Sequence, residues 1–169
     1  MKTDCPDSLS EALRVAVRFL GYRPRSAAEV VRRLETRGFS DQVVQAAIDR
    51  MAQQGLVDDE RFAQLWIEGR TGSRPVGPAR LARELAQRGV ERSLAERAIA
   101  RLYQAERLEQ AIDREIRRYW PRLVRSGKNQ LRERLVGILA RRGYEPWLVE
   151  QRLEGVLELI DLDREGRES

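Results

Sequence analysis

Three adjacent acids in the stretch "GLVDDERFAQLWIEGR" are the residues best suited to metal binding or acid/base chemistry: Asp58, Asp59 and Glu60. Successive side chains on a helix point about 100° apart, so these carboxylates alone do not converge on one reacting atom. At a helix start the same arrangement has a structural role. Asp58 accepts a backbone N–H as the N-cap, and the next two acids oppose the positive end of the helix dipole. We therefore interpret the three acids as the beginning of a helix.

The composition narrows the possible chemistry further. The chain contains no histidine and a single cysteine, Cys5, which removes the usual ligands of zinc and most transition metals. Histidine-based proton transfer and Ser-His-Asp catalysis are excluded as well. Other acids, such as Glu109 and Asp113, form no constellation of converging carboxylates. The sequence thus predicts a binding protein, with no catalytic residues, metal site, cofactor or small-molecule substrate.

The overall composition indicates a folded, basic and highly charged protein. Hydrophobic residues make up 41% of the 169 positions and charged residues 35%, with a net charge of +5 and an isoelectric point near 10.0. No apolar run approaches the ~20 residues that a membrane span needs. The chain also does not begin with a basic segment followed by an apolar one. We therefore expect a cytoplasmic protein without membrane contact.

One helix ending occurs three times, at intervals of about fifty residues: "RRLETRGF" (32–39), "RELAQRGV" (83–90) and "GILARRGY" (137–144). Each copy has a leucine, three further residues, a glycine and then a hydrophobic residue. A glycine just beyond a helix adopts the left-handed conformation that closes it, and the next hydrophobic residue packs back on the last turn. We therefore assign Gly38, Gly89 and Gly143 as structural residues of an internal repeat.

The repeat predicts the fold class. Each copy has room for three helices, and no run alternates apolar and polar residues as a strand does. We expect an all-α fold of nine helices, in an elongated, curved array of three tandem three-helix repeats that lean on each other. The expected bounds are a tail at 1–9, repeats at 10–57, 58–106 and 107–160, and a second tail at 161–169.

Local signals predict where individual helices begin and end. Ser10 is expected to begin the first helix, "SAAE" (26–29) to form a capping box, and Pro78 to occupy a first turn. Pro121 is expected to end the helix that precedes it, and Pro146 to open the last helix.

Apolar spacing predicts which side chains are buried. Val17 is expected on the apolar face of the first helix, and Phe62 and Trp66, four residues apart, on one buried face. Trp147 also has apolar neighbours at helical spacing and is predicted to lie in the core. Trp120 lies beside Pro121 and several arginines, and its surroundings do not decide its environment.

These residues resemble a known family. The segments "GLVDDERFA" (55–63) and "GPARLARELAQRGV" (77–90), with Arg70 between them, resemble the signature of RecX, the bacterial regulator of the recombinase RecA. "YRPRSAAEVVRRLETRGF" (22–39) is similar to the first repeat of that family, and "LVGILARRGYEPWLVEQRL" (135–153) to the third. The resemblance implies a cytoplasmic, non-catalytic protein of DNA repair and the SOS response. Such a protein binds RecA, lies in the groove of its filament on DNA, and limits its recombinase, ATPase and co-protease activities.

The resemblance also suggests roles for single residues. The positions that match the family signature are Asp58, Asp59, Phe62, Arg70, Gly77, Pro78, Arg80 and Gly89. Among these, Phe62, Gly77, Pro78 and Gly89 are interpreted as residues that make the fold. Arg70 and Arg80 are better candidates for partner contact. The loop "TGSRPV" departs from the pattern, because Arg74 is its single basic residue where many relatives have more.

Charge is distributed unevenly along the chain. Residues 70–92 hold six arginines and two acids, a balance of +4, and residues 114–142 hold nine arginines and one lysine against two acids, or +8. Residues 143–169 reverse the sign, with three arginines and eight acids, or −5. A basic stripe flanked by aromatic residues such as Tyr119 is suited to a nucleic-acid backbone or an acidic protein surface.

Twelve basic residues are therefore candidates for contact with RecA or DNA: Arg70, Arg74, Arg80, Arg83, Arg88, Arg114, Arg117, Arg118, Arg122, Arg125, Lys128 and Arg132. The alternative for the first block is a solvated helix face, since Arg80, Glu84 and Arg88 have the spacing for ion pairs. Contact is favoured for the second block, where eight charges lack a local partner. A free-standing, non-specific DNA-binding module stays an alternative function, and a monomer is expected in either case.

Overall fold

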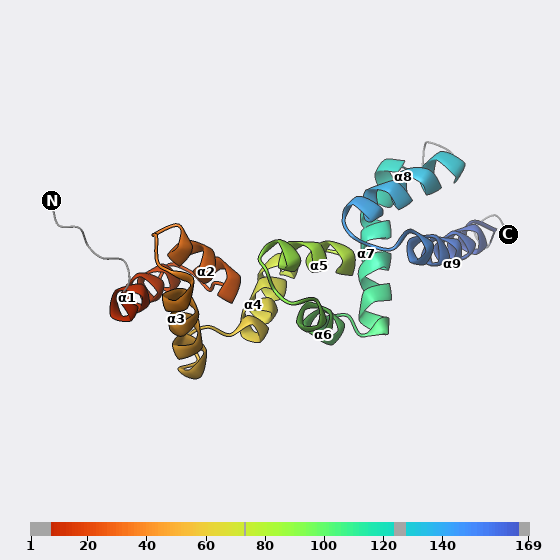
Figure 1. The fold of residues 1–169 in the computed structure, drawn as a ribbon. Coiled ribbons are helices and arrows are strands. Elements are labelled where there is room, and N and C mark those ends of the chain that lie inside the picture. Colours follow the sequence, from red (N-terminus) through yellow and green to blue (C-terminus); the bar gives the residue numbers. More distant parts are fainter. Residues whose placement is uncertain (1–7, 73, 124–127, 166–169) are drawn as a thin grey trace. The chain divides into compact units, whose positions relative to one another are not determined.

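The computed structural model describes residues 8–72, 74–123 and 128–165, and in these ranges the chain forms nine α-helices and no strand (Figure 1). The helices are α1 (Leu9–Leu20), α2 (Ala27–Glu35), α3 (Asp41–Gln53), α4 (Asp59–Thr71), α5 (Pro78–Gln87), α6 (Arg92–Leu102), α7 (Ala105–Leu123), α8 (Lys128–Arg141) and α9 (Pro146–Glu165). The prediction of an all-α, three-helix repeat fold is confirmed. In the part of the chain that the structure describes, no helix is long and apolar enough to cross a membrane.

The chain divides into two compact units. The first unit contains Met1–Gly69 and Glu84–Ala98, and the second contains Arg70–Arg83 and Ile99–Ser169. The division falls within the second predicted repeat, because residues of α4, α5 and α6 are shared between the two units.

The core of the first unit lies among α1, α2 and α3. Small residues of α1, Ala12 and Ala16, are fully buried with Val30 and Leu34 of α2. The prediction for Val17 is wrong, since this side chain is 49% exposed. The reason is that α1 turns its alanine face to the core, which lets the neighbouring helices approach closely. Leu13 and Leu20, which share the apolar spacing of Val17, pack against the core and are only partly buried.

Local capping follows the sequence closely in this unit. The Ser26 hydroxyl accepts a hydrogen bond from the Glu29 amide, and the Glu29 carboxylate accepts one from the Ser26 amide, which together form the predicted capping box. The first helix begins earlier than expected, because its N-cap is Ser8, two residues before Ser10.

The three repeated helix endings close as predicted. Gly38, Gly89 and Gly143 have φ values of 84°, 79° and 90°, in the left-handed region that glycine adopts without steric cost. In each ending the residue after the glycine donates its amide to the carbonyl of the repeat leucine, at 3.3, 3.1 and 3.1 Å. The following hydrophobic residues are buried in all three copies.

The second unit has its own core, formed by α7, α8 and α9. Ile112 and Ile116 of α7 are fully buried with Leu135 and Leu139 of α8 and Leu153 of α9. Its largest buried side chain is that of Tyr144, which follows the third repeated glycine.

Two predictions for this unit are wrong. Helix α7 does not end before Pro121 but continues to Leu123 with the proline inside it. A proline removes one hydrogen bond to the preceding turn, and this loss is small near the end of an exposed helix, where water reaches the free carbonyl. Trp147 is not a core residue, since its side chain is 63% exposed at the first turn of α9. Helix α9 extends to Glu165, so the expected tail at 161–169 begins inside it.

Candidate partner-binding surface

The contact between the start of α2 and the residues that follow α5 joins the first two repeats, and we call it the first joint. The Ser26 hydroxyl donates a hydrogen bond of 2.6 Å to the Arg88 carbonyl, and the Arg88 guanidinium pairs with Glu29 at 2.9 Å. The same guanidinium lies 3.6 Å from the centre of the Trp66 ring. A Cβ on Gly89 would lie closer than 3.0 Å to that of Ala28, so glycine is needed for the approach.

Two of the three acids of the opening stretch, Asp58 and Asp59, accept backbone amides at helix starts of the first unit. The Asp58 carboxylate accepts a hydrogen bond from the Arg61 amide at 3.0 Å, which is the predicted cap of α4. Asp59 instead accepts the Ala27 amide at 2.8 Å and so caps α2, 32 positions away in the chain. Burial raises the pKa of Asp59 above its ordinary value. The acids therefore stabilise helix starts, one of them across the first joint.

Glu29 is the electrostatic centre of the first joint. Burial opposes its ionisation, but hydrogen bonds from Arg23 and from the Ser26 amide, with the nearby charge of Arg88, hold its pKa below the ordinary value. Three arginines thus share one nearly buried carboxylate, because Arg25 also lies 3.8 Å from it.

A second joint, within the second unit, connects Gly77–Arg80 with Arg142 and Gly143. The Gly77 amide donates to the Arg142 carbonyl at 2.9 Å, and the Ala79 amide to the Gly143 carbonyl at 3.1 Å. The Arg142 guanidinium donates to the Pro75 carbonyl at 2.7 Å and forms an ion pair with Glu115. Glu115 is 2% exposed, so this pair is buried.

Several of the predicted contact arginines have partners inside the chain. Arg88 belongs to the first joint, and Arg118 lies 3.9 Å from Glu115. Arg132 pairs with Glu154 of α9 at 3.1 Å. Arg70 and Arg80 are half-buried, and each interacts with another group of the chain. The charges of the second basic block were expected to lack a local partner, and the fold gives one of them a distant partner, since Glu154 of α9 reaches Arg132.

Glu109 and Asp113, considered above as catalytic acids, have structural partners as well. Arg152 of α9 donates a hydrogen bond of 3.0 Å to Glu109 and forms an ion pair with Asp113, both on α7. The pair of acids therefore fastens α9 to α7. Among the described residues, no group of three or more histidine, cysteine or acidic side chains is placed to hold a metal ion.

The arginines that stay available lie mainly on α7. Arg114, Arg117 and Arg122 are exposed, and no ion pair involves them in the described ranges. Arg74 and Arg83 are exposed too. Arg125 lies outside the described residues, and so does the side chain of Lys128, whose backbone begins α8.

Sequence reasoning missed Arg107, which belongs to the same exposed side of α7 as Arg114. These two arginines line a hollow of 340 Å³, and Pro75, Leu102 and Tyr103 form much of the rest of its wall. The Tyr103 hydroxyl donates to the Val76 carbonyl at 2.6 Å, and burial raises its pKa. The residue lies just before the block that we counted, so its charge was left out.

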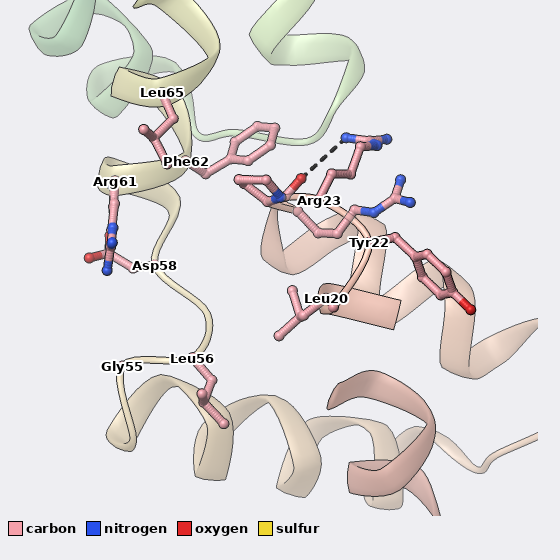
Figure 2. Close-up of a pocket in the computed structure, with 12 residues that line it drawn as sticks. Leu20, Tyr22, Arg23, Gly55, Leu56, Asp58, Arg61, Phe62 and Leu65 are labelled. Carbon is pink, nitrogen blue, oxygen red and sulfur yellow. Dashed lines mark hydrogen bonds between the residues drawn. The ribbon is translucent and has the colours of Figure 1, made fainter. Parts of the chain in front are cut away.

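A second surface that the sequence did not predict lies in the first unit (Figure 2). It is a pocket of 360 Å³ whose wall includes exposed apolar side chains, with Tyr22 74%, Leu56 46% and Leu65 42% exposed. Arg23 and Arg61 stand on different sides of it, the first from the connection between α1 and α2 and the second from α4. Such a mixture of apolar and cationic groups suits a protein partner.

Comparison with known proteins identifies the family. Residues 12–51 match the family profile described as RecX, first three-helix domain, and residues 58–99 match that of RecX, second three-helix domain. The chain is 34% identical over 168 residues to the regulatory protein RecX of Mycobacterium avium (strain 104), covering 98% of this chain and 94% of the relative. It is 37% identical over 141 residues to that of Mycolicibacterium vanbaalenii, covering 79% of this chain and 76% of the relative.

Solved structures show the same fold. The crystal structure of RecX from Lactobacillus salivarius superposes with a TM-score of 0.80 at 16% sequence identity, covering 87% of this chain and 95% of the other. A second crystal structure, of a regulatory protein RecX, gives a TM-score of 0.75, with 86% and 71% of the two chains covered. At this identity the structures support the fold alone, but the relative from Mycobacterium avium is 34% identical and covers 98% of this chain. The chain therefore belongs to the RecX family of regulatory proteins.

Proposed function

We propose that this chain binds the RecA recombinase and its filament on DNA, and limits the recombinase, ATPase and co-protease activities of RecA in DNA repair and the SOS response. The observation that carries the proposal is the similarity to a regulatory protein RecX over 98% of the chain, including both matched three-helix domains. RecA acts on DNA in the cytoplasm, and this is where the chain is proposed to act.

The proposed action is steric and electrostatic rather than catalytic. The acids that a hydrolase would need are engaged in helix caps and ion pairs, as Asp58, Asp59 and Asp113 illustrate. We propose that the chain is a monomer with three repeats, at 10–57, 58–106 and 107–160. These repeats are proposed to contact successive RecA protomers. Such contacts obstruct filament growth, or its closure around ATP, without any cofactor.

The exposed arginines of α7 are proposed to contact the filament. Arg107, Arg114, Arg117 and Arg122 carry charges that no acid in the described ranges neutralises. A filament on DNA presents phosphates and acidic protein groups, and guanidinium groups bind both.

The test is ATP hydrolysis by RecA on single-stranded DNA with increasing amounts of the chain. We expect a dose-dependent decrease, and a several-fold weaker effect for a triple Arg114→Glu, Arg117→Glu, Arg122→Glu variant. Arg50→Glu, a charge reversal on the exposed side of α3, is the matched control and should inhibit like the wild type. The absence of any effect at saturating wild-type protein would contradict the proposal.

The free arginines of α7 also favour a second candidate function, non-specific DNA binding without RecA. The two functions differ in how binding depends on salt and on RecA. If the chain acts alone, its affinity for single-stranded DNA should be high at low salt and fall steeply as salt increases, because phosphate contacts release counterions. If RecA is the partner, tight binding should require the filament.

A further inference from the structure

The hollow between α1 and α2 in the first repeat has no role in the function proposed above. Its volume is 600 Å³, and four arginines line it, Arg14, Arg18, Arg33 and Arg37, with Glu11 as the one acid. None of these residues was among the twelve candidates from the sequence. The hollow lies entirely within the first unit.

This hollow lies in the first repeat at the place that corresponds to Arg88 and Gly89 of the second repeat, which meet the start of α2 in the first joint. Arg37 and Gly38 end the helical segment of α2 as Arg88 and Gly89 end that of α5, in the repeated motif. Gly89 is covered by Ala28, but a Cβ on Gly38 would meet no atom within 4 Å. The first repeat therefore carries the same helix ending as the second, and among the described residues nothing covers its glycine as Ala28 covers Gly89.

The charges of the hollow are unbalanced. Arg14 pairs with Glu11 at 2.6 Å, whereas Arg18, Arg33 and Arg37 form no ion pair with any described residue. The Arg33 Nε atom is buried and has no hydrogen-bond partner in the described part of the chain. Its guanidinium lies 5.6 Å from the centre of the Phe19 ring, at the wall of the hollow. Guanidinium groups without an acidic partner in the described ranges, such as those of Arg18 and Arg37, favour an anionic ligand, because it supplies charge-assisted hydrogen bonds.

We propose that this hollow binds the start of a helix of a protein partner, and that the first turn of this helix carries a carboxylate. The first joint is the template: there Glu29 reaches Arg88 while the Ser26 hydroxyl donates to the Arg88 carbonyl. The inference deepens the proposed function, on which it rests for the identity of the partner. The expected sequence feature is a hydroxyl residue followed by small residues and an acid, as in Ser26–Glu29.

The template favours a helix start over a nucleic-acid phosphate. At the first joint the receptor offers both a guanidinium and a backbone carbonyl, so the ligand both accepts and donates hydrogen bonds. A helix start with a hydroxyl and a carboxylate provides both kinds of group. A phosphodiester offers acceptors alone, and its charge opposes the Arg37 carbonyl.

The first experiment uses the full chain and a synthetic helical peptide that begins Ser-Ala-Ala-Glu and continues with neutral helix-forming residues. Fluorescence anisotropy of the labelled peptide should show saturable binding. Binding should fall about tenfold for the Arg33→Ala, Arg37→Ala double variant, since charge-assisted hydrogen bonds are lost. A peptide with Gln in place of Glu should show a similar loss. Arg50→Ala is the matched control and should bind normally, and the melting temperature of each variant checks that it folds.

The second experiment measures inhibition of RecA ATPase on single-stranded DNA by the Arg37→Glu variant. We expect the concentration for half-maximal inhibition to rise about tenfold, in line with the peptide result. If the wild type does not inhibit, the proposed function fails, and the peptide experiment still decides the inference. If the wild type inhibits but Arg37→Glu inhibits equally and the peptide does not bind, the inference is overturned. The inference is also overturned, in favour of nucleic acid, if a single-stranded oligonucleotide binds and the peptide does not. Binding of the oligonucleotide would then depend on Arg37.

Discussion

The two joints use the same position of the repeat in different ways. In the first joint, the side chains of Ser26, Glu29 and Arg88 make the connection between repeats. In the second joint, the backbone amides of Gly77 and Ala79 make the connection, and the Arg142 guanidinium adds a bond to the Pro75 carbonyl while it also pairs with Glu115 of its own repeat.

This difference indicates which substitutions each joint tolerates. A connection through side chains fails when one partner changes its charge or its hydroxyl, but it leaves the backbone spacing some freedom. A connection through backbone groups is independent of most side chains, but it requires residues without a Cβ where the two segments meet. The following changes test that distinction, beginning with the largest expected effect.

Arg142→Ala should destabilise the chain most, by about 3–5 kcal/mol, because it removes the closer cation of the buried Glu115 carboxylate and leaves only the half-exposed Arg118, 3.9 Å away, near it. Chemical denaturation of the variant and the wild type measures this difference. Combining Arg142→Met with Glu115→Gln should recover much of the loss, since no unpaired buried charge remains. A cost below about 1 kcal/mol for Arg142→Ala would place the pair among exposed ion pairs and contradict its burial.

Gly77→Ala should cost about 1–3 kcal/mol through overpacking. A Cβ at this position would lie closer than 3.0 Å to the backbone of Gly143, which has no flexible end to move away. The matched control is Gly69→Ala in α4, where an added Cβ meets nothing within 4 Å. The control should be neutral or gain up to about 1 kcal/mol from the higher helix propensity of alanine. Equal free energies of unfolding for the two variants would show that the second joint is not tightly packed.

Glu29→Gln should weaken the first joint by about 1–2 kcal/mol at neutral pH, through the loss of charge-assisted hydrogen bonds. The pKa of Glu29 is lower in the folded chain than the ordinary value of about 4.3, so its stabilisation is complete above that pH. It is lost as the pH falls through the lowered pKa. Denaturation curves should therefore differ between wild type and variant at pH 7 and converge on acidification. A difference that stays constant to low pH would contradict an electrostatic origin.

Arg132→Ala should have the smallest effect, within about 0.5 kcal/mol. Its pair with Glu154 is exposed on both sides, since the two side chains are 45% and 60% accessible. The same denaturation measurement distinguishes this exposed pair from the joints. A cost as large as that of Glu29→Gln would contradict the small contribution expected of an exposed ion pair.

Local interactions explain which features were predictable from the sequence. The capping box at Ser26, the helix start at Pro78 and the left-handed glycines each depend on neighbours within about one helical turn. The predictions that failed lacked such neighbours. Trp147 has apolar residues at helical spacing, but its side chain is 63% exposed, and Pro121 lies where a helix end tolerates it.

The candidate surfaces were less predictable than the fold. Charge counts located the exposed arginines of α7, but they also included Arg88, Arg118 and Arg132, which have acidic partners in the folded chain. They omitted Arg37, because its repeat has no large excess of positive charge. Ion pairing depends on which acids the fold brings near, and net charge along a segment carries no such information.

The sequence by itself determined the helical repeat, its closing glycines and the family, because periodicity and short-range capping act through residues close together in the chain. Tertiary structure alone decided that Asp59 caps α2, that Arg88 pairs with Glu29, and that Arg142 binds the carbonyl of Pro75. These contacts join residues from 32 to 67 positions apart. Their formation depends on how the repeats pack, and no local pattern encodes that arrangement.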